Sequence, residues 1–137
     1  MDVAYQWRGP FADEDVNALH AEGFDHPVLD IGWRRQVERH SLGWVCAYDQ
    51  ERLVGFVNVA WDGGVHAFVL DTLVHGDARH EGIGTGLLAV ASREARAAGC
   101  EWLHVDFDED LSGFYLGGCG FAPTPAGVMA LWQRAAT

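Results

Sequence analysis

Hydrophobic and polar residues change their spacing several times along the chain, and these changes mark the expected elements. Short apolar or alternating stretches predict strands at residues 3–7, 43–48, 52–60, 67–74 and 102–107. Apolar residues three and four apart predict helices at residues 13–22, 29–40, 84–98 and 111–117. A closing hairpin is expected from Phe121 and residues 128–132. The order β-αα-βββ-α-β-α-β predicts an α/β (α+β) fold, in which helices cover both faces of a mixed sheet.

A glycine-rich segment lies between the strand expected at 67–74 and the helix expected at 84–98. It reads Gly82-Ile83-Gly84-Thr85-Gly86 and follows Arg79-His80-Glu81. A turn of this kind leaves several backbone N–H groups unpaired, and the helix adds the positive end of its dipole to them. The segment therefore predicts an anion site whose natural ligand is a phosphate or a pyrophosphate.

Two common phosphate-binding loops do not fit this segment. A Walker loop ends in Gly-Lys-Ser/Thr, but all nine basic residues of this chain are arginines. A Rossmann fingerprint requires a third glycine at position 87, where the chain has Leu87, and it opens near the start of a βαβ chain. The pattern that remains is Arg-x-x-Gly-x-Gly, formed by Arg79, Gly82 and Gly84.

This pattern resembles motif A of the GNAT superfamily of N-acetyltransferases, and the match extends from about Val65 to Phe121. The first half of the chain fits only by the order of its elements. The resemblance implies a mixed, mostly antiparallel central sheet of six to seven strands, with the strands on either side of the loop helix splayed apart. It also implies acetyl-CoA as co-substrate, no metal, and transfer of an acetyl group to a primary amine by direct attack.

The resemblance places the site for acetyl-CoA on the glycine-rich loop and the strand before it. Loop amides would bind the pyrophosphate, and a backbone N–H near the end of the strand would polarise the acetyl carbonyl. The implied set of cofactor-binding residues is Leu73, Val74, Arg79, His80, Glu81, Gly82, Ile83, Gly84, Thr85 and Gly86.

A tyrosine in an F/L-Y-x-x-x-G-F pattern usually protonates the leaving thiolate in this family. Here one extra residue separates Phe114-Tyr115 from Gly120-Phe121. Counting forward from the start of the short helix selects Tyr115, whereas counting back from Gly120 selects Leu116. We favour Tyr115 as the acid; its alternative role is to pack under the cofactor. Asp108 stands where many members have an asparagine that contacts the cofactor, and we expect it to face the substrate instead.

The residue that accepts the proton of the amine is left open by the sequence. Asp71 lies in an otherwise apolar strand, so it needs a partner if it is buried. It is either the proton acceptor or a structural aspartate at a strand bulge. Asp106, on the next strand, is a second acidic candidate that could border the substrate cleft. The imidazole candidates are His66, His75 and His104. For each of them, a surface or half-buried position without a catalytic role is the alternative.

Phe24 and Trp33 fall in the region that covers the acceptor in the resembled family. They could line a pocket for an apolar part of the substrate, or they could belong to the core. The acceptor itself is open, because this first half of the chain varies within the family. A small-molecule or peptide amine is expected.

Charge and length limit the partners and the number of domains that the chain can have. The net charge of −11 argues against nucleic acid as a partner, and it serves either solubility or the attraction of a cationic amine. A length of 137 residues predicts one domain, residues 1–137. No apolar run could span a membrane, and the start does not resemble a signal peptide. A homodimer is possible.

Cysteine and histidine spacing adds a location and excludes one kind of site. The three cysteines are an odd number without C-x-x-C spacing, which suits a reducing compartment such as the cytoplasm. The seven histidines are scattered and form no H-x-x-x-H pair, so no metal site is predicted. Two other functions remain possible: a catalytically silent acyl-CoA-binding module, and an interaction scaffold.

Overall fold

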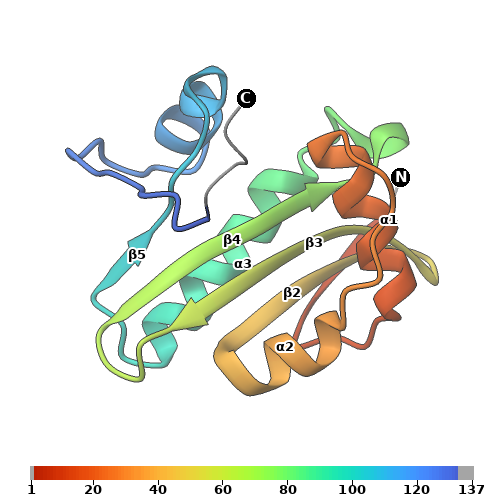
Figure 1. Ribbon diagram of the computed structural model, residues 1–137, viewed down its shortest axis with the longest axis horizontal. Coiled ribbons are helices and arrows are strands. Elements are labelled where there is room, and N and C mark those ends of the chain that lie inside the picture. Colours follow the sequence, from red (N-terminus) through yellow and green to blue (C-terminus); the bar gives the residue numbers. More distant parts are fainter. Residues whose placement is uncertain (1, 133–137) are drawn as a thin grey trace. The chain divides into compact units, whose positions relative to one another are not determined.

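The computed structural model describes residues 2–132. The chain divides into two compact units, Met1–Val105 and Asp106–Thr137. The first unit carries the sheet and the three longer helices, which are labelled in Figure 1. Among the described residues, no helix combines the length and the apolar character that crossing a membrane would need.

The first unit is built on a five-stranded sheet whose strands lie in chain order. These strands are β1 (Val3–Trp7), β2 (Ser41–Asp49), β3 (Arg52–Trp61), β4 (His66–Val74) and β5 (Trp102–His104). The first four pair antiparallel, and β5 runs parallel to β4. A parallel pair needs a crossover, which α3 (Ile83–Ala97) supplies. The predicted order of elements is confirmed this far, with five strands instead of six to seven.

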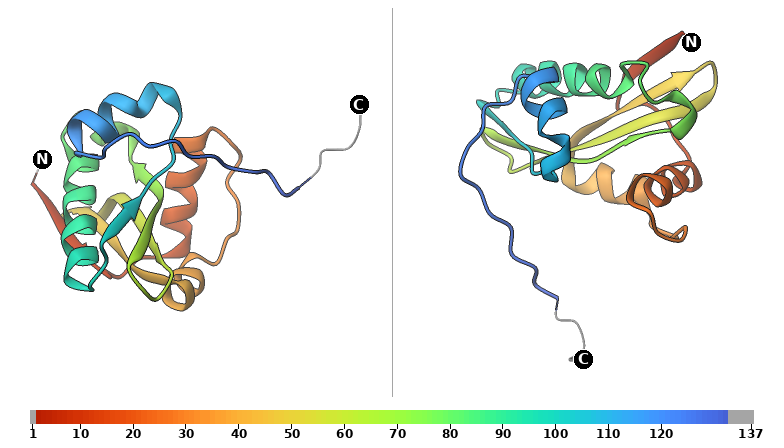
Figure 2. Two further views of the ribbon diagram at one scale, coloured as in Figure 1. Left: turned by 90° about the vertical axis from the view of Figure 1, so that its left-hand side faces the viewer. Right: turned by 90° about the horizontal axis from the view of Figure 1, so that it is seen from above.

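Helices cover both faces of the sheet, as predicted. Figure 2 (right) shows α3 on one face, with α1 (Asp13–Phe24) and α2 (Trp33–His40) on the other. Alternate residues of β3 meet these two layers, because successive side chains of a strand point to opposite faces. Phe56 packs in the cluster beneath α1 and α2, whereas Gly55 lies against Ile83 of α3. With both faces covered, residues 43–47 and 53–59 are buried without interruption.

The second helix begins later than the pattern predicts. Leu29 and Ile31 continue the apolar spacing of the predicted helix, but α2 starts only at Trp33, after the N-cap residue Gly32. The side chain of Asn17 takes both backbone groups of Ile31: its amide donates to the carbonyl at 3.0 Å, and its oxygen accepts from the N–H at 3.2 Å. These bonds hold the connection in a non-helical path, so tertiary contacts override the local preference.

Strand β4 contains a β-bulge near its end. Leu70 pairs with Asn58 and Leu73 pairs with Phe56, so Asp71 and Thr72 together oppose the single residue between them on β3. Asp71 has a φ of 56°, in the left-handed region that aspartate tolerates better than most residues do. The bulge therefore gives Asp71 a backbone conformation that differs from that of its neighbours in the strand.

The second unit has less regular structure than the sequence predicts. A 3-10 turn (Glu109–Leu111) and a π-helix (Gly113–Gly118) replace the short helix expected at 111–117. The strand expected at 102–107 ends at His104. The closing hairpin is wrong within the described part of the chain, because residues 119–132 contain no strand there. Pro123 and Pro125 lack the N–H groups that a ladder needs, and apolar alternation alone supplies no partner strand.

The close packing of the sheet predicts opposite effects for two glycine substitutions. A Cβ at Gly43 would lie 2.2 Å from the Trp7 ring, whereas one at Gly23 in α1 would meet nothing closer than 3.5 Å. We expect Gly43→Ala to lower the free energy of unfolding by about 1–3 kcal/mol. Gly23→Ala should raise it by about 0.5 kcal/mol, since alanine favours the helix. Urea unfolding of both variants measures this, and equal effects would contradict the observed packing.

Candidate active site

The glycine-rich loop ends at the N-terminus of α3 and leaves that helix end open. Gly82 is the N-cap residue with a φ of 77°, and its carbonyl accepts the Gly86 N–H at 3.0 Å. The N–H groups of Ile83, Gly84 and Thr85 precede any possible intrahelical acceptor. No side chain within residues 2–132 caps them, and the first turn holds no acidic residue. These donors and the positive end of the helix dipole are suited to an anion.

Two residues of the loop also have structural roles. The Ile83 side chain is 1 % exposed and packs in the core, so only its backbone could meet a ligand. A Cβ at Gly86 would lie 2.3 Å from the Tyr5 ring, which explains glycine there without a ligand. His80, Glu81 and Thr85 are exposed. The backbone of the loop is thus the main candidate for anion binding.

Arg79 lies beside the loop and has a carboxylate neighbour. Its Nη2 is 3.8 Å from Oε1 of Glu22 on α1, and that same oxygen accepts the Gly76 N–H. Both charged side chains are about half exposed, at 51 % and 42 %. An exposed pair of this kind contributes at most about 1 kcal/mol. Arg79 can therefore exchange Glu22 for a phosphate at small cost.

Asp71 is half-buried at the β4 bulge and has two polar neighbours. Its Oδ1 lies 3.4 Å from Nε2 of His20 on α1, within ion-pair distance. Burial raises the pKa of the Asp71 carboxyl, although His20 and a hydrogen bond from the Asn58 side chain act in the opposite direction. Asn58 is 2 % exposed, and its side-chain oxygen accepts from the Ser41 hydroxyl. The carboxyl is thus held in place while its affinity for a proton is increased.

Sequence reasoning missed two histidines that the fold brings to Asp71. His20 Nδ1 lies 2.7 Å from His26 Nε2, and His26 Nδ1 lies 2.6 Å from the Pro27 carbonyl oxygen. The turn after α1 makes this possible: Asp25 is left-handed, with a φ of 52°, and the His26 N–H bonds back to the carbonyl of Ala21. The signal in the sequence was a histidine one turn after Val16, on the apolar side of the predicted helix.

Aromatic rings surround His20. The centroid of its ring lies 4.6 Å from that of Phe24 and 5.3 Å from that of Trp33. Trp33 is only 3 % exposed, and its indole N–H donates to Asn17, so it belongs to the core as well as to this cluster. Phe24 is 55 % exposed and could meet a ligand from solvent.

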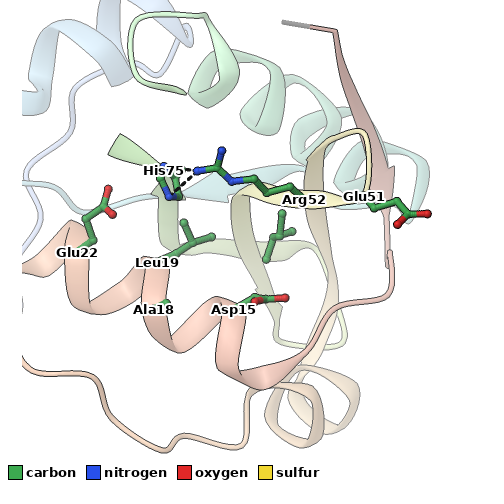
Figure 3. Close-up of a pocket in the computed structure, with 8 residues that line it drawn as sticks. Asp15, Ala18, Leu19, Glu22, Glu51, Arg52 and His75 are labelled. Atoms are coloured by element: carbon green, nitrogen blue, oxygen red, sulfur yellow. Dashed lines mark hydrogen bonds between the residues drawn. The ribbon is translucent and has the colours of Figure 1, made fainter. Parts of the chain in front are cut away.

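His75 belongs to a different neighbourhood. Figure 3 shows it beside Arg52. Both residues line a hollow of about 250 Å³, whose other lining residues come from α1 and from around the start of β3. The Arg52 guanidinium lies 2.8 Å from the His75 ring, and His75 Nδ1 accepts the Asp77 N–H at 3.1 Å. The wall of the hollow mixes carboxylates with this one guanidinium, and Asp71 is not part of it. His75 therefore supports the turn that leads into the glycine-rich loop.

His66, at the beginning of β4, and His104, at the end of β5, bond to each other. Their nitrogens are 2.8 Å apart, and the His104 ring stacks on Phe68 at 4.7 Å. Asp71 comes five positions after His66 along β4, which corresponds to about 16 Å. The two imidazoles are thus not brought to the carboxylate at the bulge.

The other predicted residues lie in the second unit. Tyr115 is buried, and its ring centroid is 4.9 Å from that of Phe107, 4.7 Å from Phe114 and 6.0 Å from Phe121. Asp106 and Asp108 are exposed. The aromatic rings fix the orientation of the Tyr115 ring within its unit.

Comparison with known proteins agrees with this arrangement of loop, helix and sheet. The model of the Acetyltransferase (GNAT) family matches residues 4–121, which is most of the chain. The chain belongs to the acetyltransferase (GNAT) family. It is therefore an acyltransferase, of a family whose fold uses acetyl-CoA. No curated protein sequence matches it.

Solved structures share the GNAT fold at low sequence identity. A GNAT family acetyltransferase from Streptococcus pneumoniae TIGR4 is 22% identical with a TM-score of 0.76, over 97% of this chain and 100% of the other. An acetyltransferase from Trypanosoma brucei is 19% identical with a TM-score of 0.76, over 94% and 99%. AAC(6′)-Iy, in complex with the bisubstrate analogue CoA-S-monomethyl-acetylneamine, is 16% identical with a TM-score of 0.76, over 98% and 100%.

The cysteines of this GNAT protein are poor nucleophiles. Burial raises the pKa of the Cys46 thiol to about 11, and it also raises the pKa of Cys100 and Cys119. None of the three forms a disulfide. Within residues 2–132, no group of three or more His, Cys, Asp or Glu side chains is placed to hold a metal ion. The thiols therefore give no support to a covalent acyl-enzyme.

The raised pKa of Asp71 predicts a stability cost that depends on pH. The folded protein holds the carboxyl proton more tightly than the unfolded chain, so stability falls as the pH rises from the ordinary pKa of 3.8 to the folded one. Asp71→Asn cannot ionise and tolerates the left-handed backbone. We expect the variant to gain stability over the wild type at pH 7 but not at about pH 3. Urea unfolding at both pH values tests this, and an equal change at both would contradict it.

Proposed function

We propose that this GNAT protein transfers an acetyl group from acetyl-CoA to a primary amine by direct attack. The observation that carries the proposal is the open N-terminus of α3. It combines a left-handed Gly82, three N–H groups that no described side chain caps, and a first turn without carboxylates, with Arg79 nearby. These features support binding of the diphosphate of acetyl-CoA by Arg79, His80, Glu81 and Gly82–Gly86, mainly through backbone atoms.

The edge of β4 supports a place for the rest of the cofactor. In the described sheet, β5 pairs only with His66, Ala67 and Phe68 of β4 (Figure 1). The remaining part of β4 has no strand partner on that side, so its backbone groups are available to the amides of a pantetheine arm. We assign polarisation of the acetyl carbonyl to a backbone N–H near Leu73 or Val74.

Acetyl transfer to an ammonium group requires the nitrogen to lose two protons and the sulfur to gain one. The ammonium first loses a proton, for which Asp71 is the acidic candidate. The neutral amine then attacks the thioester carbonyl: the N–C bond forms, the C–S bond breaks, and the nitrogen gives up its second proton. The thiolate takes a proton from Tyr115, since Leu116, the alternative in the motif, has none to give.

The acceptor is proposed to be a cationic amine with an apolar part. The carboxylate of Asp71 and the net charge of −11 favour a cation, and the exposed Phe24 ring favours an apolar group. Trp33, Asp106 and Asp108 are further candidates for acceptor contacts. The reduced cysteines suit the cytoplasm. A single functional domain over residues 1–137 and a possible homodimer remain predictions.

A charge placed at the open helix end tests the diphosphate site. Thr85 is exposed in the first turn of α3, so Thr85→Glu should leave the fold intact and favour the helix dipole. The same carboxylate would repel a diphosphate. We expect affinity for acetyl-CoA to fall about tenfold or more, equivalent to about 1.4 kcal/mol, in calorimetric titration.

Thr85→Gln is the matched control, because it has a similar size without the charge, and it should bind as the wild type does. Equal affinity of the Glu and Gln variants for acetyl-CoA would show that its diphosphate does not bind at this helix end. Thiol release from acetyl-CoA across a panel of amines then tests catalysis. A wild type that binds acetyl-CoA but acetylates no amine would be a silent binding module.

A further inference from the structure

We infer that Asp71 and His20 act together as the acceptor of a single proton, and that His26 fixes the tautomer of His20 required for this. The inference rests on the proposed acetyl transfer and names the groups that remove the proton of the ammonium substrate. It follows from the direction of three consecutive polar contacts, which run from the Pro27 carbonyl to the β4 bulge.

The first contact fixes His26. A carbonyl oxygen only accepts hydrogen bonds, and that of Pro27 lies 2.6 Å from His26 Nδ1. Nδ1 of His26 must therefore carry a proton and donate it. In the neutral imidazole, this leaves Nε2 of His26 with a lone pair.

The second contact determines which ring nitrogen of His20 is protonated. Nε2 of His26 is 2.7 Å from Nδ1 of His20, so the acceptor on His26 requires an N–H on His20. Nδ1 of neutral His20 is then the protonated nitrogen. Its other nitrogen, Nε2, has the lone pair, and this is the nitrogen that faces Asp71.

The third contact is where a proton can be gained. Nε2 of His20 lies 3.4 Å from Oδ1 of Asp71, so without a proton a lone pair faces a carboxylate. Two facing acceptors favour the uptake of one proton between them, after which the pair is an imidazolium beside a carboxylate or its neutral equivalent. The pair thus holds either no proton or one, and its charge changes from −1 to 0.

The residues around the Asp71–His20 pair favour the uptake and release of this proton. Phe24 and Trp33 pack against the His20 ring, and Asn58 bonds to Asp71 from β3. The titratable groups described in contact with His20 are Asp71 and His26. Glu22, the neighbouring acid on α1, interacts with Gly76 and Arg79. Side-chain exposures of 19 % for His20 and 23 % for Asp71 leave a path by which water can remove the proton.

The proposed acetyl transfer needs one acceptor for one proton, because one proton is released overall. The ammonium gives its proton to the Asp71–His20 pair and becomes a neutral amine, which can attack the thioester. The second nitrogen proton, lost after the N–C bond forms, balances the proton that the thiolate takes as the C–S bond breaks. The pair then releases its proton to water and returns to its starting charge. His26 is a positioning residue, because it acts only through His20.

The tautomers can be observed without activity. Long-range ¹H–¹⁵N spectra of protein labelled in its histidine rings distinguish a protonated Nδ1 from a protonated Nε2. We expect His26 and His20 both to carry the proton on Nδ1 above the pH at which their rings are charged. A neutral His20 protonated on Nε2 would overturn the inference, whatever the protein does with acetyl-CoA.

Substitutions of His26 test the positioning role. His26→Gln retains a side-chain oxygen that can accept from His20 Nδ1, so kcat should stay within about threefold of the wild type. His26→Leu removes the acceptor, and kcat should fall about tenfold or more with little change in the KM for acetyl-CoA. Melting temperatures of both variants control for folding. Equal kcat values for Gln and Leu would contradict the role of His26.

Replacing His20 tests the shared proton. In His20→Gln, only the Asp71 carboxylate remains to take the proton, since one of the two facing acceptors is lost. The acidic limb of the kcat/KM profile should therefore move to lower pH. An unmoved limb would exclude His20 from the pair. If the wild type neither binds nor turns over acetyl-CoA, the proposed function fails, while the tautomer measurement still decides the arrangement of the histidines.

Discussion

The β-bulge in β4 is the constraint on which the candidate site depends. In a regular strand, Leu70 and Thr72 would share the face toward α1 and α2, and Leu73 would point to the opposite face. The extra residue moves Leu73 into the cluster under α1 and α2, opposite Phe56. It also places Asp71 in the left-handed region, within reach of His20. One irregularity therefore completes the core and presents the carboxylate.

Two buried amides hold the walls of this region. Asn17 and Asn58 are the buried polar residues of the described chain, and both are hydrogen-bonded. Asn17 fixes the connection before α2 and the indole of Trp33, which packs against His20. Asn58 joins Ser41 to Asp71 across the sheet. The polar groups that the fold buries are thus used to position the cluster around His20.

The N-termini of the two longest helices, α1 and α3, differ in charge. The first turn of α1 contains three acidic residues, which balance its dipole within the protein. The first turn of α3 contains none, although the chain as a whole has a net charge of −11. The nearest acidic residue in the chain, Glu81, precedes the N-cap Gly82 and is exposed, so the first turn itself carries no negative charge. That difference is what an anionic ligand such as acetyl-CoA requires.

Sequence alone determined the parts of the protein whose signals are local. The glycine loop, Arg79 and the helix after them could be predicted because backbone conformation and helix termini depend on neighbouring residues. The family followed from the order of these motifs. The position of Asp71 in an apolar strand also indicated that it needs a partner, but not which one.

Only the tertiary structure decided the partner and the irregular regions. His20 and His26 meet because Asp25 turns the chain back on α1, and α1 then packs over the bulge of β4. Residues 128–132 form no strand although their pattern predicted one, since a strand forms only where another strand accepts its hydrogen bonds. Contacts between residues distant in sequence have no local pattern, so the proton-accepting pair could be recognised only once the chain was folded.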